Sequence, residues 1–178
     1  MNMQRIVVIG QGYVGLPVAM RAIEVGMDVV GFDVDQRKID GMLAGRSHID
    51  DITDADIAAA LATGRFLPTR NEADMANFDV AVITVPTPLR DGQPDLSFID
   101  SAGRMLAPHV TRGSTVVLES TTYPGTTDEM LVPILEAGSG LSAGDDFHVG
   151  FSPERIDPGN ETWNFQRTPK VVSGIDEA

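Results

Sequence analysis

Three glycines follow the first apolar run of the chain at a spacing that suits a phosphate-binding turn. Residues 6–15 read IVVIGQGYVG, so Gly10, Gly12 and Gly15 form the pattern G-x-G-x-x-G directly after a β-branched stretch. In such a turn the first glycine permits the tight bend and the second lets a pyrophosphate approach the backbone. The third glycine allows the following helix to pack closely on the strand. Backbone amides and the positive end of the helix dipole then hold the phosphates, so the pattern predicts a dinucleotide-binding turn.

An acidic residue closes the next apolar run. Asp33 ends the stretch DVVGFD, at the distance from the glycines where a ribose-binding carboxylate is expected. Such a carboxylate accepts hydrogen bonds from both hydroxyls of an adenosine ribose, and it repels a 2′-phosphate. The residue therefore favours NAD over NADP as the ligand of this turn.

Three polar turns each follow an expected strand further along the chain. They are TVPTP at 84–88, ESTTYPGTT at 119–127 and SPE at 152–154. Each turn alone is compatible with a simple loop. Open α/β sheets, however, bind ligands at the carboxyl ends of their strands, where all three turns lie. We therefore expect the three turns to converge on one edge of the sheet and to border one ligand site.

The elements that must position these residues alternate between strand and helix patterns from end to end. The apolar runs are nearly continuous, as expected for strands covered on both faces. This order predicts an α/β fold, a Rossmann-type doubly wound, mainly parallel sheet with helices on both faces, as one domain over residues 1–178. Expected strands are Arg5–Ile9, Asp28–Phe32, Phe66–Pro68, Asp79–Val85, Ser114–Glu119 and Phe147–Phe151. Expected helices lie near Tyr13–Val25, Asp35–Leu43, Asp54–Ala62, Leu96–Ala107 and Thr127–Ala137, with a solvent loop from Gly138 and an irregular stretch from Asp157.

The composition of the chain excludes several classes of partner and of chemistry. The 178 residues carry 26 acidic and 13 basic side chains, a net charge of −13, which argues against nucleic acid as a partner. No apolar run approaches the ~20 residues of a membrane helix, and the start of the chain has no signal-peptide pattern, so a cytoplasmic protein without a membrane partner is expected. There is no cysteine, which excludes disulfides, thiolate metal sites and a cysteine nucleophile within these residues.

No metal site is expected. His48, His109 and His148 show no ligand spacing and are interpreted as surface or core residues. The acidic run DDITDAD at 50–56 is better explained as the capped first turn of a helix than as a cation site.

Taken together, the motifs resemble those of the UDP-glucose/GDP-mannose dehydrogenase family. The matching stretches are IGQGYVGLP, GFDVDQRKID, VPTP, ESTTYPGTT and FSPERIDPG, in that order and over nearly the whole chain. The resemblance is to the amino-terminal NAD-binding domain, and FSPERIDPGN is most similar to the branch that acts on UDP-N-acetylglucosamine and UDP-N-acetylmannosamine. It implies oxidation of the C6 alcohol of a UDP-sugar to the carboxylate in two steps that use two NAD.

The resemblance also implies roles for individual residues. In the pyrophosphate turn these are Gly10, Gly12, Tyr13, Val14 and Gly15. Beside the adenosine ribose they are Asp33 and Lys38. The adenine-ribose and diphosphate side of the cofactor is bordered by Val85, Pro86, Thr87 and Pro88, and the nicotinamide lies near Ser120 and Thr121. For catalysis it implies that Thr121 positions a water and that Glu154 acts with this water in hydrolysing a covalent intermediate, with Glu154 and Arg155 facing the substrate.

The chain departs from the family pattern at two points. UDP-glucose enzymes commonly carry a second glutamate where this chain has Pro158, which favours an acetamido sugar. The family's chemistry passes through a thiohemiacetal on a cysteine, assisted by a lysine and an asparagine, and this chain has no cysteine. We therefore expect a fragment that lacks the central helix, the catalytic cysteine and the UDP-sugar-binding domain of the complete enzyme, which is expected to be a homo-oligomer. Such a fragment binds NAD without turnover.

Three other interpretations remain open at this point. One is a UDP-glucose 6-dehydrogenase, and another is a stand-alone NAD-sensing regulatory module, which would need neither ESTTYPGTT nor SPE. A third is a 3-hydroxyacid dehydrogenase, for which a catalytic lysine on a later helix is expected, whereas Lys170 lies in a short irregular stretch.

Overall fold

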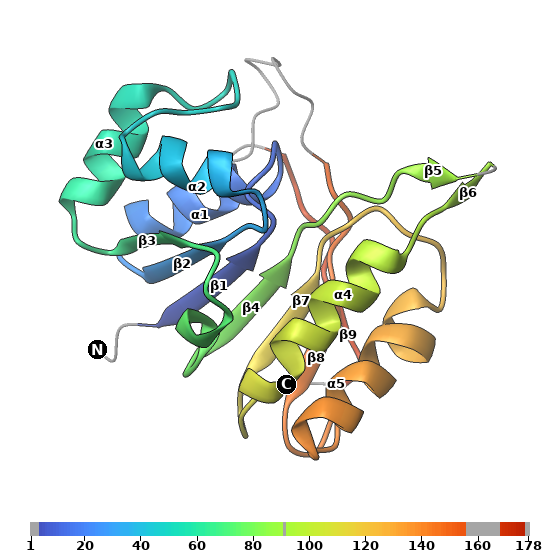
Figure 1. Ribbon diagram of the computed structural model, residues 1–178. Coiled ribbons are helices and arrows are strands. Elements are labelled where there is room, and N and C mark those ends of the chain that lie inside the picture. The colour runs from blue at the N-terminus through green and yellow to red at the C-terminus, as the bar shows by residue number, and fades with distance from the viewer. Residues whose placement is uncertain (1–3, 91, 156–167, 177–178) are drawn as a thin grey trace.

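Six parallel strands form the central sheet of the computed structural model, which describes residues 4–90, 92–155 and 168–176 (Figure 1). The sheet order is β3-β2-β1-β4-β7-β8-β9, and only β9 at its edge runs antiparallel to its neighbour. The parallel strands are β1 (Arg5–Ile9), β2 (Asp28–Phe32), β3 (Phe66–Thr69), β4 (Val80–Ile83), β7 (Thr115–Leu118) and β8 (His148–Phe151). The order reverses between β1 and β4, which is the switch point where such sheets bind ligands.

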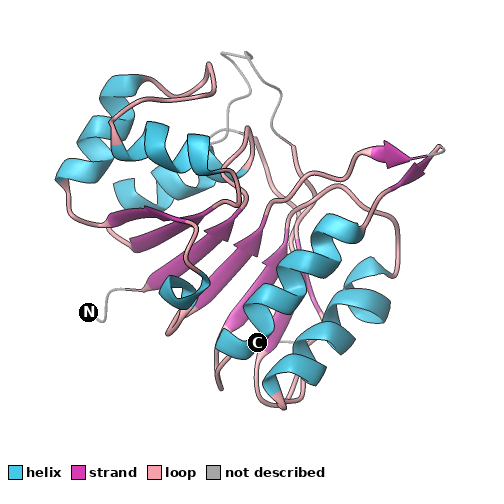
Figure 2. Cartoon of the chain, in the orientation of Figure 1, coloured by secondary structure: helices cyan, strands magenta, loops and turns pink. Residues whose placement is uncertain are grey.

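Helices cover both faces of this sheet (Figure 2). On one face, α1 (Gly15–Glu24), α2 (Gln36–Leu43) and α3 (Asp54–Ala62) share a core with Ile6 and Val8 of β1. On the other face, α4 (Ser97–Leu106) and α5 (Val132–Ser139) share a second core with Val7 and Ile9. Successive residues of β1 point to opposite faces of the sheet, and the four residues Ile6–Ile9 are all buried. Burial on both faces explains why this run of the sequence is continuously apolar. The doubly wound α/β fold expected from the sequence is confirmed.

Nearby side chains and a glycine determine where several helices begin and end. Asp35 caps α2 by accepting a hydrogen bond from the amide of Arg37. Thr53 and Asp56 form a reciprocal capping box at the start of α3, so the acidic run before that helix is a cap, as expected. Gly26, with φ of +96°, follows the end of α1 in a left-handed conformation that a glycine adopts without strain.

Several expectations are corrected at element ends. The strands expected at Asp79–Val85, Ser114–Glu119 and Phe147–Phe151 are one or two residues shorter at one or both ends, because the terminal residues already turn towards the next segment. The solvent loop expected from Gly138 begins later, since α5 continues to Ser139. A Cβ on Gly138 would lie 2.4 Å from that of Ala107, so this glycine allows α5 to pack against η2 (Ala107–His109).

Some elements carry no clear sequence signal. The single helix expected over Thr127–Ala137 starts as a π-helical segment, η3 (Thr126–Leu131), before α5. A two-stranded hairpin of β5 (Leu89–Arg90) and β6 (Gln93–Pro94) projects from the molecule (Figure 1). The remaining elements are the short helix η1 (Glu72–Met75) and β9 (Ser173–Gly174), which pairs with β8 within the stretch expected to be irregular. Among the described residues no helix has both the length and the apolar character to cross a membrane.

Candidate dinucleotide-binding site

The first and third glycines of the turn lie where any side chain would collide with backbone. Gly10 has φ of +96°, and a Cβ on it would lie 2.8 Å from the carbonyl oxygen of Thr84. A Cβ on Gly15 would lie 1.9 Å from the carbonyl oxygen of Gly10 and 2.4 Å from the hydroxyl of Thr84. The turn therefore needs glycine at both positions to fold on the end of β4.

The second glycine has no such packing role. A Cβ on Gly12 would meet no atom within 4 Å, and Gly12 lines a cavity together with Tyr13 and Val14. Because α1 begins at Gly15 and has no acidic residue in its first turn, its positive end is available to an anion in this cavity. The open space above Gly12 and the start of α1 together form a backbone cradle that fits a pyrophosphate.

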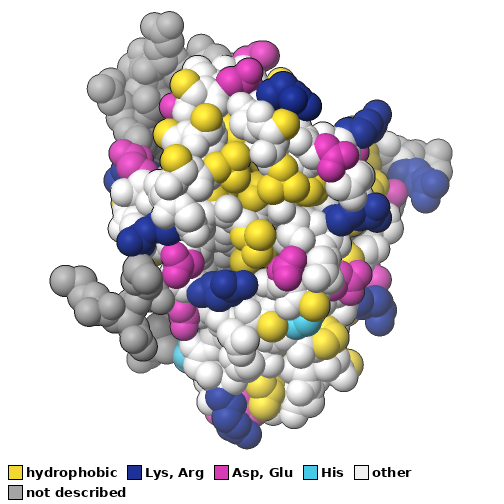
Figure 3. Space-filling view, turned by 60° about the vertical axis from the view of Figure 1, so that its left-hand side comes forward, with side chains coloured by type: hydrophobic (Ala, Val, Ile, Leu, Met, Phe, Trp, Pro, Cys, Tyr) yellow, Lys and Arg dark blue, Asp and Glu magenta, His cyan; other side chains and the backbone are white. Residues whose placement is uncertain are grey.

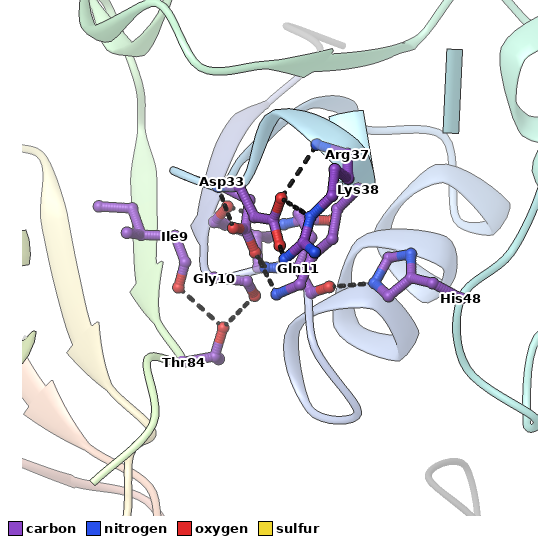
Figure 4. Close-up of polar contacts among 10 residues, drawn as sticks. Ile9, Gly10, Gln11, Asp33, Arg37, Lys38, His48 and Thr84 are labelled. Atoms are coloured by element: carbon purple, nitrogen blue, oxygen red, sulfur yellow. Dashed lines mark hydrogen bonds and ion pairs between the residues drawn. The ribbon is translucent and has the colours of Figure 1, made fainter. Parts of the chain in front are cut away.

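Thr84 joins the turn to the neighbouring strand (Figure 4). Its hydroxyl lies 2.9 Å from the carbonyl oxygen of Ile9 and 2.8 Å from that of Gly10, so it donates to the carbonyls at the start of the turn. Its amide also donates to the Ile9 carbonyl, at 2.9 Å. Thr84 is buried, and it connects the ends of β1 and β4 beneath the cavity.

Asp33 lies at the end of β2 and is buried. Its Oδ2 accepts hydrogen bonds from the amide of Gln11 at 2.8 Å and from the ammonium of Lys38 at 2.8 Å, as Figure 4 shows. Its Oδ1 accepts from the amide of Asp35 at 2.9 Å. A carboxylate offers about four acceptor positions, so Asp33 can anchor the turn and still accept from a ribose hydroxyl.

A second carboxylate lies beside Asp33. Asp35 lines the same cavity, and its hydrogen bond with the side chain of Arg37 lowers the pKa of Asp35 to about 2. Asp35 is therefore ionised at neutral pH. Lys38 pairs with Asp33 and Arg37 pairs with Asp35, so both cations are already engaged, and the buried carboxylate of Asp33 makes this end of the cavity unfavourable for an additional phosphate.

One cavity of about 630 Å³ connects these groups, within the range expected for a cofactor site. It extends along the carboxyl ends of the strands from β2 across β1 and β4 to β7. The site residues expected from the sequence that line it are Gly10, Gly12, Tyr13, Val14, Asp33, Lys38, Val85, Pro86, Thr87, Ser120, Thr121 and Glu154. The three polar turns therefore converge on one edge of the sheet, as their positions predicted.

Three expected site residues do not line this cavity. Gly15 lies beneath the turn, where its role is packing. Pro88 is exposed at the base of the β5–β6 hairpin, where its carbonyl accepts a hydrogen bond from Asp95. Arg155 is exposed. Pro158 lies outside the described residues, so its position relative to the cavity is not assigned.

The turn after β7 presents hydroxyl groups with different environments. Ser120 is buried, and its hydroxyl donates to the carbonyl of Val85 at 2.7 Å, which ties β7 to the turn after β4. Thr121 is exposed and lines the cavity, and Glu154 from the end of β8 lines it as well. An exposed hydroxyl and a carboxylate on the same wall can hold and activate a water molecule.

Sequence reasoning missed several residues of the cavity. Phe98, Ser101 and Met105 contribute one wall from α4. Phe98 is among the exposed large hydrophobic side chains, although phenylalanine is usually buried. Figure 3 shows hydrophobic side chains gathered in the upper middle of the face in view, with basic and acidic side chains scattered singly around them.

Two further residues were missed because their partners are distant in sequence. His48 is exposed, in agreement with its interpretation as a surface residue, and its Nε2 also lies 2.5 Å from the carbonyl oxygen of Gln11 in the glycine turn (Figure 4). Glu119 lines the cavity, although it is 4 % exposed, and it forms an ion pair with Lys170. Within the described part of the chain, no group of three or more His, Asp or Glu side chains is arranged to hold a metal ion.

The fold and this cavity define a dinucleotide-binding domain of the Rossmann type. The glycine turn, the open cradle at Gly12 and the acceptor at Asp33 fit NAD, and the ammonium of Lys38 at this end of the cavity is already paired with Asp33. Residues 4–178 match the family model described as the UDP-glucose/GDP-mannose dehydrogenase family, NAD binding domain. The chain belongs to this family and is its NAD-binding domain, which confirms the resemblance of the sequence motifs and the cofactor.

The chain is similar to curated enzymes of this family. It is 39% identical over 173 residues to the UDP-N-acetyl-D-glucosamine 6-dehydrogenase of Pseudomonas aeruginosa, covering 96% of the chain and 40% of that enzyme. It is 37% identical over 174 residues to the UDP-N-acetyl-D-mannosamine dehydrogenase of Pyrococcus horikoshii, covering 97% of the chain and 41% of that enzyme. The chain thus spans about two fifths of the length of these relatives.

Solved structures agree with the fold. The structure of UDP-D-ManNAc dehydrogenase from Pyrococcus horikoshii superposes with a TM-score of 0.90 at 36% identity, over 98% of this chain and 42% of that one. A ternary complex of GDP-mannose dehydrogenase from Pseudomonas aeruginosa also gives a TM-score of 0.90, at 32% identity, over 97% of this chain and 41% of that one.

Proposed function

We propose that this domain serves an NAD-dependent nucleotide-sugar 6-dehydrogenase that oxidises the C6 alcohol of a UDP-N-acetylhexosamine to the carboxylate in two steps. The domain supplies the NAD site and one wall of the active site. A cysteine nucleophile and most of the UDP-sugar contacts come from other parts of a longer, homo-oligomeric protein. By itself the chain binds NAD without turnover.

The observation that carries this proposal is the composition of the cavity beside the glycine turn. Asp33 and Lys38 lie at its β2 end, whereas Thr121 and Glu154 line its β7 and β8 end. A dinucleotide that follows the glycine turn has its two nucleosides at opposite ends of such a cavity. Supporting the substrate class, relatives at 37% and 39% identity are named as dehydrogenases of UDP-N-acetylmannosamine and UDP-N-acetylglucosamine.

Within this proposal each residue has a definite task. Bound NAD supplies the hydride acceptor. Asp33 fixes the adenosine ribose, and Gly12 with the start of α1 holds the pyrophosphate. The hydroxyl of Thr121 orients a water, and the carboxylate of Glu154 takes a proton from that water as it attacks the acyl carbon of the thioester formed on the cysteine of the complete protein. The C–S bond then breaks, which releases the sugar carboxylic acid and returns the cysteine thiolate. Arg155 is proposed to face the substrate rather than the cofactor.

The test uses the complete protein encoded by the reading frame that contains this chain. It is incubated with UDP-N-acetylglucosamine, UDP-N-acetylmannosamine and UDP-glucose, and NADH is counted per sugar oxidised. The proposal predicts two NADH per acetamido sugar, little reaction with UDP-glucose, and no turnover by the 178-residue chain alone. One NADH per sugar, or a clear preference for UDP-glucose, would contradict it.

A Glu154→Gln variant of the complete protein separates the proposed hydrolytic role from cofactor binding. It is expected to lose turnover while its affinity for NAD stays within about twofold, because a general base is not a binding contact. A matched Arg155→Gln variant is expected to raise KM for the sugar more than it lowers kcat. Equal loss of NAD affinity in the Glu154 variant would argue for a structural role instead.

A further inference from the structure

A partly buried ion pair lies at the β7 end of the cavity and has no task in the function proposed above. Glu119 directly follows β7, and its amide donates to the carbonyl of Ile83 at 2.9 Å. Its side chain is only 5% exposed, and yet Glu119 is part of the cavity wall. Its carboxylate contacts the ammonium of Lys170, whose side chain is 26% exposed.

Lys170 lies near Glu119 because the chain returns to the edge of the sheet just before β9. β9 pairs antiparallel with β8, with Phe151 opposite Ser173, and so holds the preceding residues near the carboxyl end of β7. Burial lowers the pKa of the Lys170 ammonium from its ordinary value. Placing a partly buried cation beside a buried carboxylate costs desolvation energy that can exceed the attraction between the two charges. A gain in stability therefore does not by itself explain why this pair is present.

The sheet order locates this pair relative to the ligand. Asp33 ends β2, the glycine turn follows β1, and Glu119 follows β7, three strands away from β2. Neighbouring strands are about 4.8 Å apart, so the two carboxylates are separated by about 14 Å across the sheet. With the adenosine at Asp33 and the pyrophosphate at the turn, the second nucleoside extends towards Glu119.

The second nucleoside of NAD changes its charge in the reaction. The nicotinamide ring carries a positive charge when oxidised and none when reduced. A carboxylate nearby stabilises the oxidised ring, whereas an ammonium destabilises it, and both effects are strong in a site that is shielded from water. The other end of the ligand is identical in the two redox forms, so Asp33 and Lys38 do not distinguish them.

Resting on the proposed function, we propose that the Glu119–Lys170 pair determines the preference of the cavity between oxidised and reduced NAD. Glu119 attracts the cationic ring, and Lys170 offsets this attraction so that the reduced cofactor can leave after each step. Both are positioning and specificity residues and do not take part in the chemistry. Glu154 lies in the same cavity and adds a carboxylate that is common to every variant in the test.

The test compares the wild-type chain with Glu119→Gln, Lys170→Met and the double variant. Dissociation constants are measured for NAD, NADH and ADP-ribose, which lacks the nicotinamide. All dissociation constants are measured at the same pH and ionic strength, so that the variants differ only in sequence. The quantity of interest is the ratio of the NADH to the NAD dissociation constant, with ADP-ribose as the control for folding of the rest of the site.

We expect Lys170→Met to raise this ratio, and Glu119→Gln to lower it, each by about threefold or more, as one unit charge does in a partly screened site. The double variant restores the charge balance and is expected to lie within about twofold of wild type. Affinity for ADP-ribose stays unchanged in all three. Equal ratios in all proteins, with ADP-ribose still bound, would overturn the inference.

Lys170→Met leaves the buried carboxylate of Glu119 without its cation, so this variant is the one whose folding is most at risk. If it no longer binds ADP-ribose, Glu119→Gln and the double variant still differ only in the charge of residue 170, and their ratios must differ for the inference to stand. If wild type binds ADP-ribose but neither redox form of NAD, the inference is overturned. If wild type is folded and binds none of the three ligands, the proposed function itself fails.

Discussion

Gly12 and Gly15 belong to the same motif but serve different physical purposes. Gly12 faces open space at the wall of the cavity, whereas Gly15 is enclosed by the carbonyl of Gly10 and the hydroxyl of Thr84. One glycine is therefore needed for the ligand and the other for the fold. The spacing of the motif predicted both roles, and the side-chain space around each residue separates them.

Alanine substitutions at these two glycines should separate ligand binding from stability. Gly12→Ala is expected to unfold at the same urea concentration as wild type but to bind NAD about tenfold more weakly or worse, since its methyl group occupies the space of the ligand. Gly15→Ala is expected to lose about 2 kcal/mol or more of unfolding free energy through overpacking. Urea titrations with calorimetric binding decide this, and a stable Gly15→Ala that binds NAD normally would contradict the packing role.

Thr84 offers a second test at the scale of one side chain. Thr84→Val keeps the shape but removes the hydroxyl that donates to Ile9 and Gly10, with an expected loss of about 1 kcal/mol of unfolding free energy. We expect a larger effect on binding of NAD than of adenosine, because the turn holds the pyrophosphate. Thr84→Ser keeps the hydroxyl and should restore NAD binding. Equal weakening of NAD and adenosine would argue against this role of Thr84.

At the scale of elements, the capping box of α3 gives a prediction with a defined pH dependence. Hydrogen bonds from Thr53 hold the pKa of Asp56 below its ordinary value of 3.8. Because the folded pKa is lower than the unfolded pKa, this contribution to stability is present above about pH 4 and is lost as the pH falls below that value. Thr53→Ala is expected to lower the unfolding free energy by about 1 kcal/mol at pH 7.

The measurement is urea unfolding of wild type and Thr53→Ala at pH 7 and again at pH 3. The difference between the two proteins is expected to shrink at pH 3, where Asp56 becomes protonated in the unfolded chain. Thr63→Ala, at the other end of α3, serves as the matched control without the capping box. A difference that is independent of pH would show that the carboxylate of Asp56 does not contribute.

Elements whose determinants are local were predictable from the sequence, and those that depend on distant partners were not. β1 and β2 match their expected bounds because their apolar runs are continuous and end at polar turns. β9 contributes only Ser173 and Gly174 and exists because β8 offers it an edge. The π-helical segment η3 likewise has no local signal, and the Glu119–Lys170 pair joins residues that no spacing rule connects.

At the scale of the whole molecule, the net charge of −13 is consistent with a site built mainly from backbone amides. The glycine turn and the start of α1 offer backbone amides and a positive helix end, which fit phosphates without a cluster of basic side chains. The three turns at the carboxyl ends of β4, β7 and β8 were predictable as one site because parallel strands end at the same edge. The contribution of α4 to the cavity wall was not predictable, since the packing angle of a helix is not encoded in its own sequence.

The central claim is that these 178 residues form a working NAD site in which Asp33 excludes a 2′-phosphate. The most direct measurement is a calorimetric titration of the chain with NAD and NADP, repeated on Asp33→Asn, with circular dichroism to verify folding. Wild type is expected to bind NAD at least about tenfold more tightly than NADP, and Asp33→Asn to lose most of that preference. A folded wild-type chain that binds neither dinucleotide, or that binds both equally, would contradict the claim.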